Sequence, residues 1–154
     1  MRDTLPLWQI AWVLQATQGQ RLGLRGDYGI DYQLLNTARA RNLPIIELEG
    51  TDSQIGLLRQ LPDDGLILLD DTLTHWHTNA RLLQTMIGWW LDAPPTDSKL
   101  VLPSTFSESL YDVLMNARNQ AWRETLHALP AGRYVVAVGA LHLYGEGNLP
   151  SLLK

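Results

Sequence analysis

The chain has 154 residues, of which 45% are hydrophobic and 18% are charged, and this balance is typical of one soluble globular domain. A net charge of −4 without runs of like charge excludes an electrostatic surface for nucleic acid or for an anionic membrane. The absence of cysteine excludes a disulfide framework, a thiolate nucleophile and a zinc site built on sulfur.

Apolar residues at helical spacing, with helix-start signals before them, predict helices along most of the chain. Asp3 or Thr4 is expected to cap the first helix, which carries Pro6 in its first turn. Thr51 and Thr105 each begin a capping-box pattern. In chain order the predicted helices span residues 4–19, 29–41, 51–61, 64–73, 79–91, 105–129 and, as a short last helix, 149–153.

Two strands are predicted between these helices. Asn42 suits a left-handed helix end, and residues 44–49 follow it as a short strand. Residues 134–138 are apolar and β-branched, which is typical of a parallel strand buried on both faces. The sequence therefore predicts a helix-rich α/β fold, in which a small, largely parallel sheet is flanked by about six helices. Residues 1–154 are expected to form a single domain, with a hinge at 94–103.

A histidine follows the second predicted strand directly. Gly139 permits a sharp exit from that strand, and His142 arrives just beyond its carboxyl end. In open parallel sheets this edge collects ligands and catalytic groups, and imidazole is the commonest metal ligand. A histidine that is hydrogen-bonded in a tight turn is the competing interpretation.

Two glutamates lie on the first predicted strand and face the same side, because residues two apart on a strand share a face. Glu49 lies nearer the carboxyl end than Glu47, at the edge where His142 should emerge. Glu49 is therefore predicted to be a metal ligand, a partner of His142 or a general base. The alternative is an acid that stabilises the start of the next helix.

Four motifs occur in order along the chain: Tyr28-Gly29-Ile30-Asp31-Tyr32, Ile46-Glu47-Leu48-Glu49, Arg118-Asn119 and Val138-Gly139-Ala140-Leu141-His142-Leu143-Tyr144-Gly145-Glu146. They resemble those of the TraB/GumN family, which includes bacterial pheromone-shutdown proteins, the GumN proteins and the animal Tiki proteases. The resemblance covers nearly the whole chain.

The resemblance implies a metal-dependent, hydrolase-like or peptidase-like site with manganese, cobalt or zinc. In that scheme His142 is one ligand and Glu49 is an accompanying acid, whereas a catalytic metal normally has about three protein ligands. The resemblance also gives Arg118 and Asn119 a role in anchoring Glu49, Asp31 or an anionic substrate group. Without it, an Arg-Asn pair on a helix is normally a solvated face.

Two further acids have weaker claims. Asp31 opens its helix, where acids commonly satisfy backbone donors, so a structural role is the first expectation. Glu146 extends the His142 loop and is expected either to contribute to the site or to cap the last helix.

The family's complete domain begins with an earlier G-x-x-H motif, and no G-x-x-H occurs here before Gly139. The chain therefore resembles the carboxyl-terminal part of that domain without its amino-terminal half, and is expected to be weak or inactive alone. The expected partners are a peptide, the missing half or a second copy. The competing function is a non-catalytic interaction module that self-associates through exposed sheet edges.

The expected location is open. The first residues mix charged and polar side chains with a proline and do not form a signal peptide, and no segment approaches the length of a membrane span. Many relatives are exported, so a longer parent protein could be exported as well.

Overall fold

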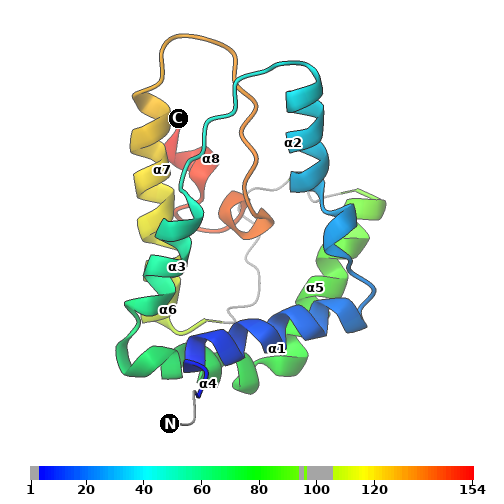
Figure 1. The fold of residues 1–154 in the computed structure, drawn as a ribbon, viewed down its shortest axis with the longest axis vertical. Coiled ribbons are helices and arrows are strands. Elements are labelled where there is room, and N and C mark those ends of the chain that lie inside the picture. The colour runs from blue at the N-terminus through cyan, green and yellow to red at the C-terminus, as the bar shows by residue number, and fades with distance from the viewer. Residues whose placement is uncertain (1–3, 94–95, 97–105) are drawn as a thin grey trace.

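The computed structural model describes residues 4–93, 96 and 106–154. Throughout these residues the regular elements are helices (Figure 1). The α-helices are α1 Leu7–Arg21, α2 Ile30–Ala40, α3 Thr51–Arg59, α4 Leu66–Thr74, α5 Trp76–Leu91, α6 Glu108–Tyr111, α7 Ala117–His127 and α8 Leu149–Leu152. Short turns of 3₁₀ type lie at Gly26–Tyr28, Pro62–Gly65 and Ala140–Leu143, and a π-helical turn lies at Asp112–Asn116.

The predicted α/β fold with a parallel sheet is wrong for this chain, because no strand occurs in the described residues. Residues 44–48 and 133–139 lie where strands were expected and have no regular secondary structure. A strand exists only when its backbone pairs with a neighbour, and within the described part of the chain residues 44–48 and 133–138 make no backbone hydrogen bonds. The apolar pattern therefore predicted the positions of both segments, but it did not show whether a neighbouring backbone pairs with them.

The predicted helices are present with shifted ends. α1 begins at Leu7 after Pro6 and is not capped by the side chain of Thr4, and Asp3 lies outside the described residues. Thr51 lies inside α3 instead of capping it. The left-handed backbone of Asn42, with φ of 52°, confirms the predicted end of α2. The expected hinge at 94–103 and Thr105 fall outside the described residues, except Thr96.

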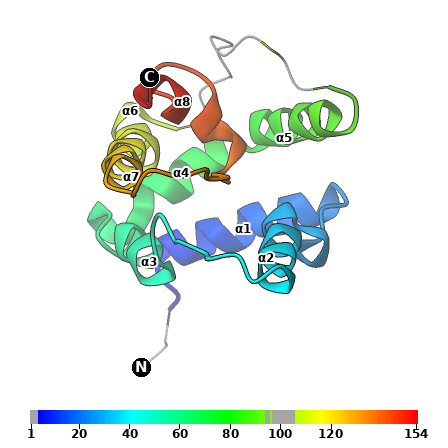
Figure 2. The same ribbon diagram turned by 90° about the horizontal axis from the view of Figure 1, so that it is seen from above.

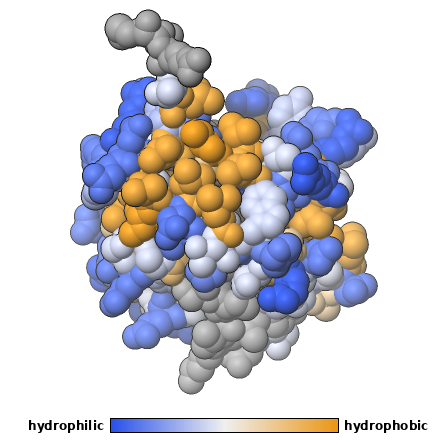
Figure 3. Space-filling model, turned by 90° about the horizontal axis from the view of Figure 1, so that it is seen from below, coloured by the Kyte–Doolittle hydropathy of each residue, from blue (hydrophilic) through white to orange (hydrophobic). Residues whose placement is uncertain are grey.

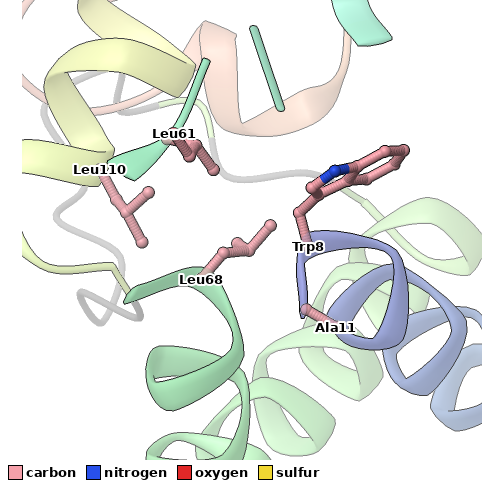
Figure 4. Close-up of a cluster of buried hydrophobic side chains, with 5 residues drawn as sticks. All are labelled: Trp8, Ala11, Leu61, Leu68 and Leu110. Atoms are coloured by element: carbon pink, nitrogen blue, oxygen red, sulfur yellow. The ribbon is translucent and has the colours of Figure 1, made fainter. Parts of the chain in front are cut away.

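The buried apolar cluster lies where α1 crosses α4. Trp8 and Ala11 of α1 meet Leu68 of α4, and Leu61 and Leu110 close the cluster from the neighbouring segments (Figure 4). In Figures 1 and 2, α1 and α4 lie across the base, whereas α7 and α2 stand above them on opposite sides. Leu110 of α6 lies in this cluster, and α6 continues through the π-helical turn into α7. The cluster therefore anchors the helix that carries much of the candidate site.

Apolar side chains also remain exposed at the base of the molecule. Figure 3 shows them gathered on the face seen from below. Val13 of α1 and Leu66 and Leu73 of α4 are each at least half exposed. No described helix is both long enough and apolar enough to span a bilayer.

Gly65 allows the close crossing of α1 and α4. Its φ is +83°, in the left-handed region, and a Cβ added there would lie 2.5 Å from Cβ of Trp8. Both the backbone angle and the contact with α1 therefore require glycine at this position.

We predict that Gly65→Ala lowers the free energy of unfolding by about 2 kcal/mol or more, because the new methyl group strains the backbone and pushes α1 away. Gly88→Ala is the matched control, since Gly88 lies inside α5 with open space around it. That change should leave stability unchanged or raise it by up to about 1 kcal/mol. Urea unfolding of the two variants measures the difference, and equal stabilities would contradict the packing described here.

Candidate functional site

Several residues of the candidate site lie on α7. Trp122 lies four residues after Arg118 and three after Asn119, so it neighbours both on the surface of the helix. Asn119 and Trp122 are buried, and Arg118 is half-buried. The longest predicted helix, 105–129, is interrupted by the π-helical turn Asp112–Asn116 directly before these residues. The wider turn adds one residue to the helix and so changes the direction in which the next residues point.

His142 is brought to this face by the short turn Ala140–Leu143. Its backbone N–H donates to the carbonyl of Gly139 at 2.9 Å, which turns the chain just after the extended segment. The imidazole is 5% exposed, and its Nδ1 lies 2.6 Å from Oδ1 of Asn119. The tight turn of the competing sequence interpretation is therefore present, and the imidazole is buried and hydrogen-bonded within it.

The hydrogen bonds of Asn119 decide which ring nitrogen carries the proton. Its Nδ2 donates to the carbonyl of Gly147 at 3.0 Å, and a carbonyl can only accept. Oδ1 must therefore accept from His142, so Nδ1 is protonated in the neutral ring. Nε2 then carries the lone pair, and the described residues form no hydrogen bond to it. Histidines that bind metal commonly have this arrangement, with one nitrogen fixed and the other open.

The surroundings of His142 keep the ring neutral. The pKa of His142 is lowered from 6.5 to about 4. Burial is the largest cause, the positive charge of Arg118 also lowers the pKa, and the negative charge of Glu49 partly opposes both effects. The Coulombic effects indicate that Glu49 and His142 belong to one electrostatic cluster, with Arg118 acting on both.

Glu49 is held by Arg118 across a sequence separation of 69 residues. Nε of Arg118 donates to both carboxylate oxygens, at 3.0 and 3.2 Å, and its terminal Nη2 forms an ion pair with Oε1. Gln54 of α3 donates to the same oxygen at 3.1 Å, and Nη1 of Arg118 donates to the carbonyl of Leu114. Each group of the pair thus has several partners, as charged groups removed from water require.

Trp122 lies between the charged and the neutral parts of the cluster. The guanidinium carbon of Arg118 lies 4.9 Å from the centre of its ring, and the centres of the Trp122 and His142 rings are 4.5 Å apart. Its indole Nε1 is buried and has no hydrogen-bond partner within the described residues. The sequence interpretation missed Trp122, although its position four residues after Arg118 places both on one face.

The other candidate residues lie outside this cluster. Asp31, Glu47 and Glu146 are exposed, and within the described residues no hydrogen bond or ion pair joins them to Glu49 or His142. The last helix is capped by Asn148, which accepts from the backbone N–H of Ser151 at 3.0 Å, and not by Glu146.

The described residues do not fit a bound metal ion on their own. No group of three histidine, aspartate or glutamate side chains that could hold one occurs among them. His142 offers one nitrogen, but both oxygens of Glu49 accept from Arg118. A metal would also meet the positive charge of that arginine.

The buried neutral ring gives stability a dependence on pH. Between about pH 6.5 and 4 the unfolded imidazole binds a proton and the folded one does not, so stability falls as the pH falls through this window. We predict that His142 contributes a loss of about 2 to 3 kcal/mol between neutral pH and pH 4. Urea unfolding at several pH values should show a smaller decline in His142→Gln than in the wild type. Parallel pH profiles would contradict this assignment.

The two charged neighbours should shift the pKa of His142 in opposite directions. Arg118→Gln removes a positive charge and should raise this pKa, whereas Glu49→Gln removes a negative charge and should lower it. NMR titration of the imidazole measures both effects. Arg123→Gln, an exposed change on the same helix, should leave the pKa unchanged. Shifts of the same sign from the two site variants would show that the cluster is assembled differently.

Comparison with known proteins agrees with the resemblance in the sequence. Proteins described as "Uncharacterized protein YbaP" from Escherichia coli (strain K12) and Shigella flexneri are each 70% identical to this chain over 152 residues. These matches cover 99% of this chain and 58% of each relative, so the chain spans less than two thirds of their length. No solved structure matches the chain. The TraB/PrgY/gumN family matches residues 1–154, and the chain belongs to this family.

Proposed function

We propose that this chain contributes part of a hydrolase-like site, in which His142 is a metal ligand and Glu49 is an accompanying acid. On its own the chain is weak or inactive. The substrate class implied by the family resemblance is peptide. Arg118 and Asn119 are positioning residues in this proposal, because each acts through Glu49 or His142.

The open Nε2 atom of His142 carries the proposal. Oδ1 of Asn119 accepts a hydrogen bond from Nδ1–H of His142, and the hydrogen bond from Nδ2 of Asn119 to the carbonyl of Gly147 fixes the orientation of the amide. A metal binds the neutral form of imidazole, and this network keeps the ring neutral with its lone pair on the free nitrogen.

The lowered pKa favours a ligand role over a general-base role. An efficient general base has a pKa near the working pH, whereas that of His142 is about 4. At neutral pH such a ring holds an abstracted proton weakly, but it needs no deprotonation before it binds a metal.

The electrostatics of the cluster explain why activity from this chain alone should be weak. A catalytic metal needs about three protein ligands, and this cluster offers one open nitrogen. The guanidinium of Arg118 forms an ion pair with the carboxylate of Glu49, and its positive charge repels a metal cation. A manganese, cobalt or zinc ion would therefore need ligands from outside the cluster.

A second candidate function is a non-catalytic interaction module that self-associates. The observation in its favour is the exposure of Ile45, Ile46 and Val135, which are 43%, 52% and 91% exposed. Light scattering over a range of concentrations tests it, since a monomer at high concentration would count against self-association.

The ligand role of His142 makes a prediction that does not require activity. Added Zn²⁺ should shift the ¹⁵N resonance of Nε2 in the wild type, and the binding should be weak because one nitrogen holds the ion. His127→Ala should retain the shift, since His127 is exposed on α7 away from the hydrogen-bond network. Hydrolysis of unstructured peptides by the chain alone should be slow or undetectable.

Asn119→Leu separates the ligand role from simple exposure of the ring. This change removes the acceptor that fixes the Nδ1 proton, so the Zn²⁺ response should become weaker or move to Nδ1. An Nε2 resonance that millimolar Zn²⁺ leaves unchanged in the wild type would sink the ligand role.

A further inference from the structure

Two extended segments of the chain expose apolar side chains in an unusual way. Residues 44–48 are named here the isoleucine segment and residues 133–138 the valine segment. Their exposed side chains include Ile45 at 43%, Ile46 at 52%, Val135 at 91% and Val136 at 42%. Successive side chains of an extended backbone point to opposite sides, so both sides of each segment are open.

The backbone of both segments is also free to bind a partner. Within the described residues, no backbone hydrogen bond involves an N–H or C=O group of either segment. Both segments run in the same direction between α7 and α2 (Figures 1 and 2). They combine unpaired backbone groups with valine, isoleucine and tyrosine side chains, which favour strands. Strand addition requires this combination. In that mode of binding an extended polypeptide forms main-chain hydrogen bonds with an exposed backbone edge.

The position of the two segments connects them with the candidate site. The isoleucine segment leads directly into Glu49, and the valine segment leads through Gly139 into the turn that holds His142. A polypeptide that pairs with either segment therefore ends its pairing beside the cluster on α7.

We infer that the isoleucine and valine segments form a docking surface for an extended strand of another polypeptide. The occupant is the polypeptide that corresponds to the part of the longer relatives outside the matched region. About two fifths of the relatives' length lies outside the match, which is long enough to supply strands and cover. The inference concerns a complex, and the isolated chain remains helical.

The chemistry of the surface favours this occupant over others. Unpaired backbone groups call for main-chain donors and acceptors, which a polypeptide supplies and a lipid or small apolar ligand does not. Apolar side chains are exposed on both sides of each segment, so the occupant must bury side chains on both sides. A second copy would bring the same two uncovered segments, so it completes the surface less well.

The test uses the full chain together with the part of the Escherichia coli relative that the match does not cover, co-expressed or mixed. We expect a one-to-one complex by light scattering and slower amide hydrogen exchange in both segments. Val135→Asp should weaken the complex by more than about tenfold, because it buries a charge at the pairing surface. Val13→Asp is the matched control, since Val13 is a 55% exposed valine of α1, outside both segments. It should change the affinity less than about twofold.

Three outcomes would overturn the inference. They are the absence of a complex, a complex without protection of either segment, and protection that arises from a homodimer when the partner is absent. The inference does not depend on metal binding by His142. His142→Gln should therefore retain the complex even if the Zn²⁺ experiment fails, so the two proposals can fail separately.

Discussion

The hydrogen bonds of Asn119 hold the candidate site together. This one side chain accepts from the His142 ring and donates to the carbonyl of Gly147, so it fixes both the histidine turn and the loop after it to α7. The amide is 3% exposed, and a buried polar group of this kind must satisfy its hydrogen bonds within the protein. Because one bond fixes the orientation of the amide, the other fixes the proton on the imidazole. Packing and protonation state are thus set by the same residue.

Arg118 gives the cluster its charge distribution. It neutralises Glu49, packs against the face of Trp122 and disfavours a second positive charge on His142. The result is a neutral imidazole in the electrostatic range of a neutralised carboxylate, and both groups are largely buried. Such an arrangement suits a ring that acts through its lone pair better than one that carries a proton.

The sequence predicted the positions of most elements but not what surrounds them. Asn42 marked the end of α2, and apolar runs located the two extended segments. Those runs were interpreted as buried strands, because an apolar pattern does not show whether the covering partner is part of the same chain. The contact of Arg118 with Glu49 was one of the expectations from the family resemblance, since local pattern cannot bring these two residues together. The hydrogen bond between Asn119 and His142 was not predicted. Trp122 was missed because an aromatic residue on a helix is usually core packing.

The π-helical turn Asp112–Asn116 has a consequence for the whole molecule. Leu110, before this turn, packs into the cluster between α1 and α4, whereas Asn119, after it, faces the histidine. An ordinary helix would rotate the later residues by about 100° relative to their present direction, since one residue fewer separates the two ends. The extra residue therefore lets one continuous helix serve two unrelated surfaces, with its first turn in the apolar cluster and its later turns against the histidine turn.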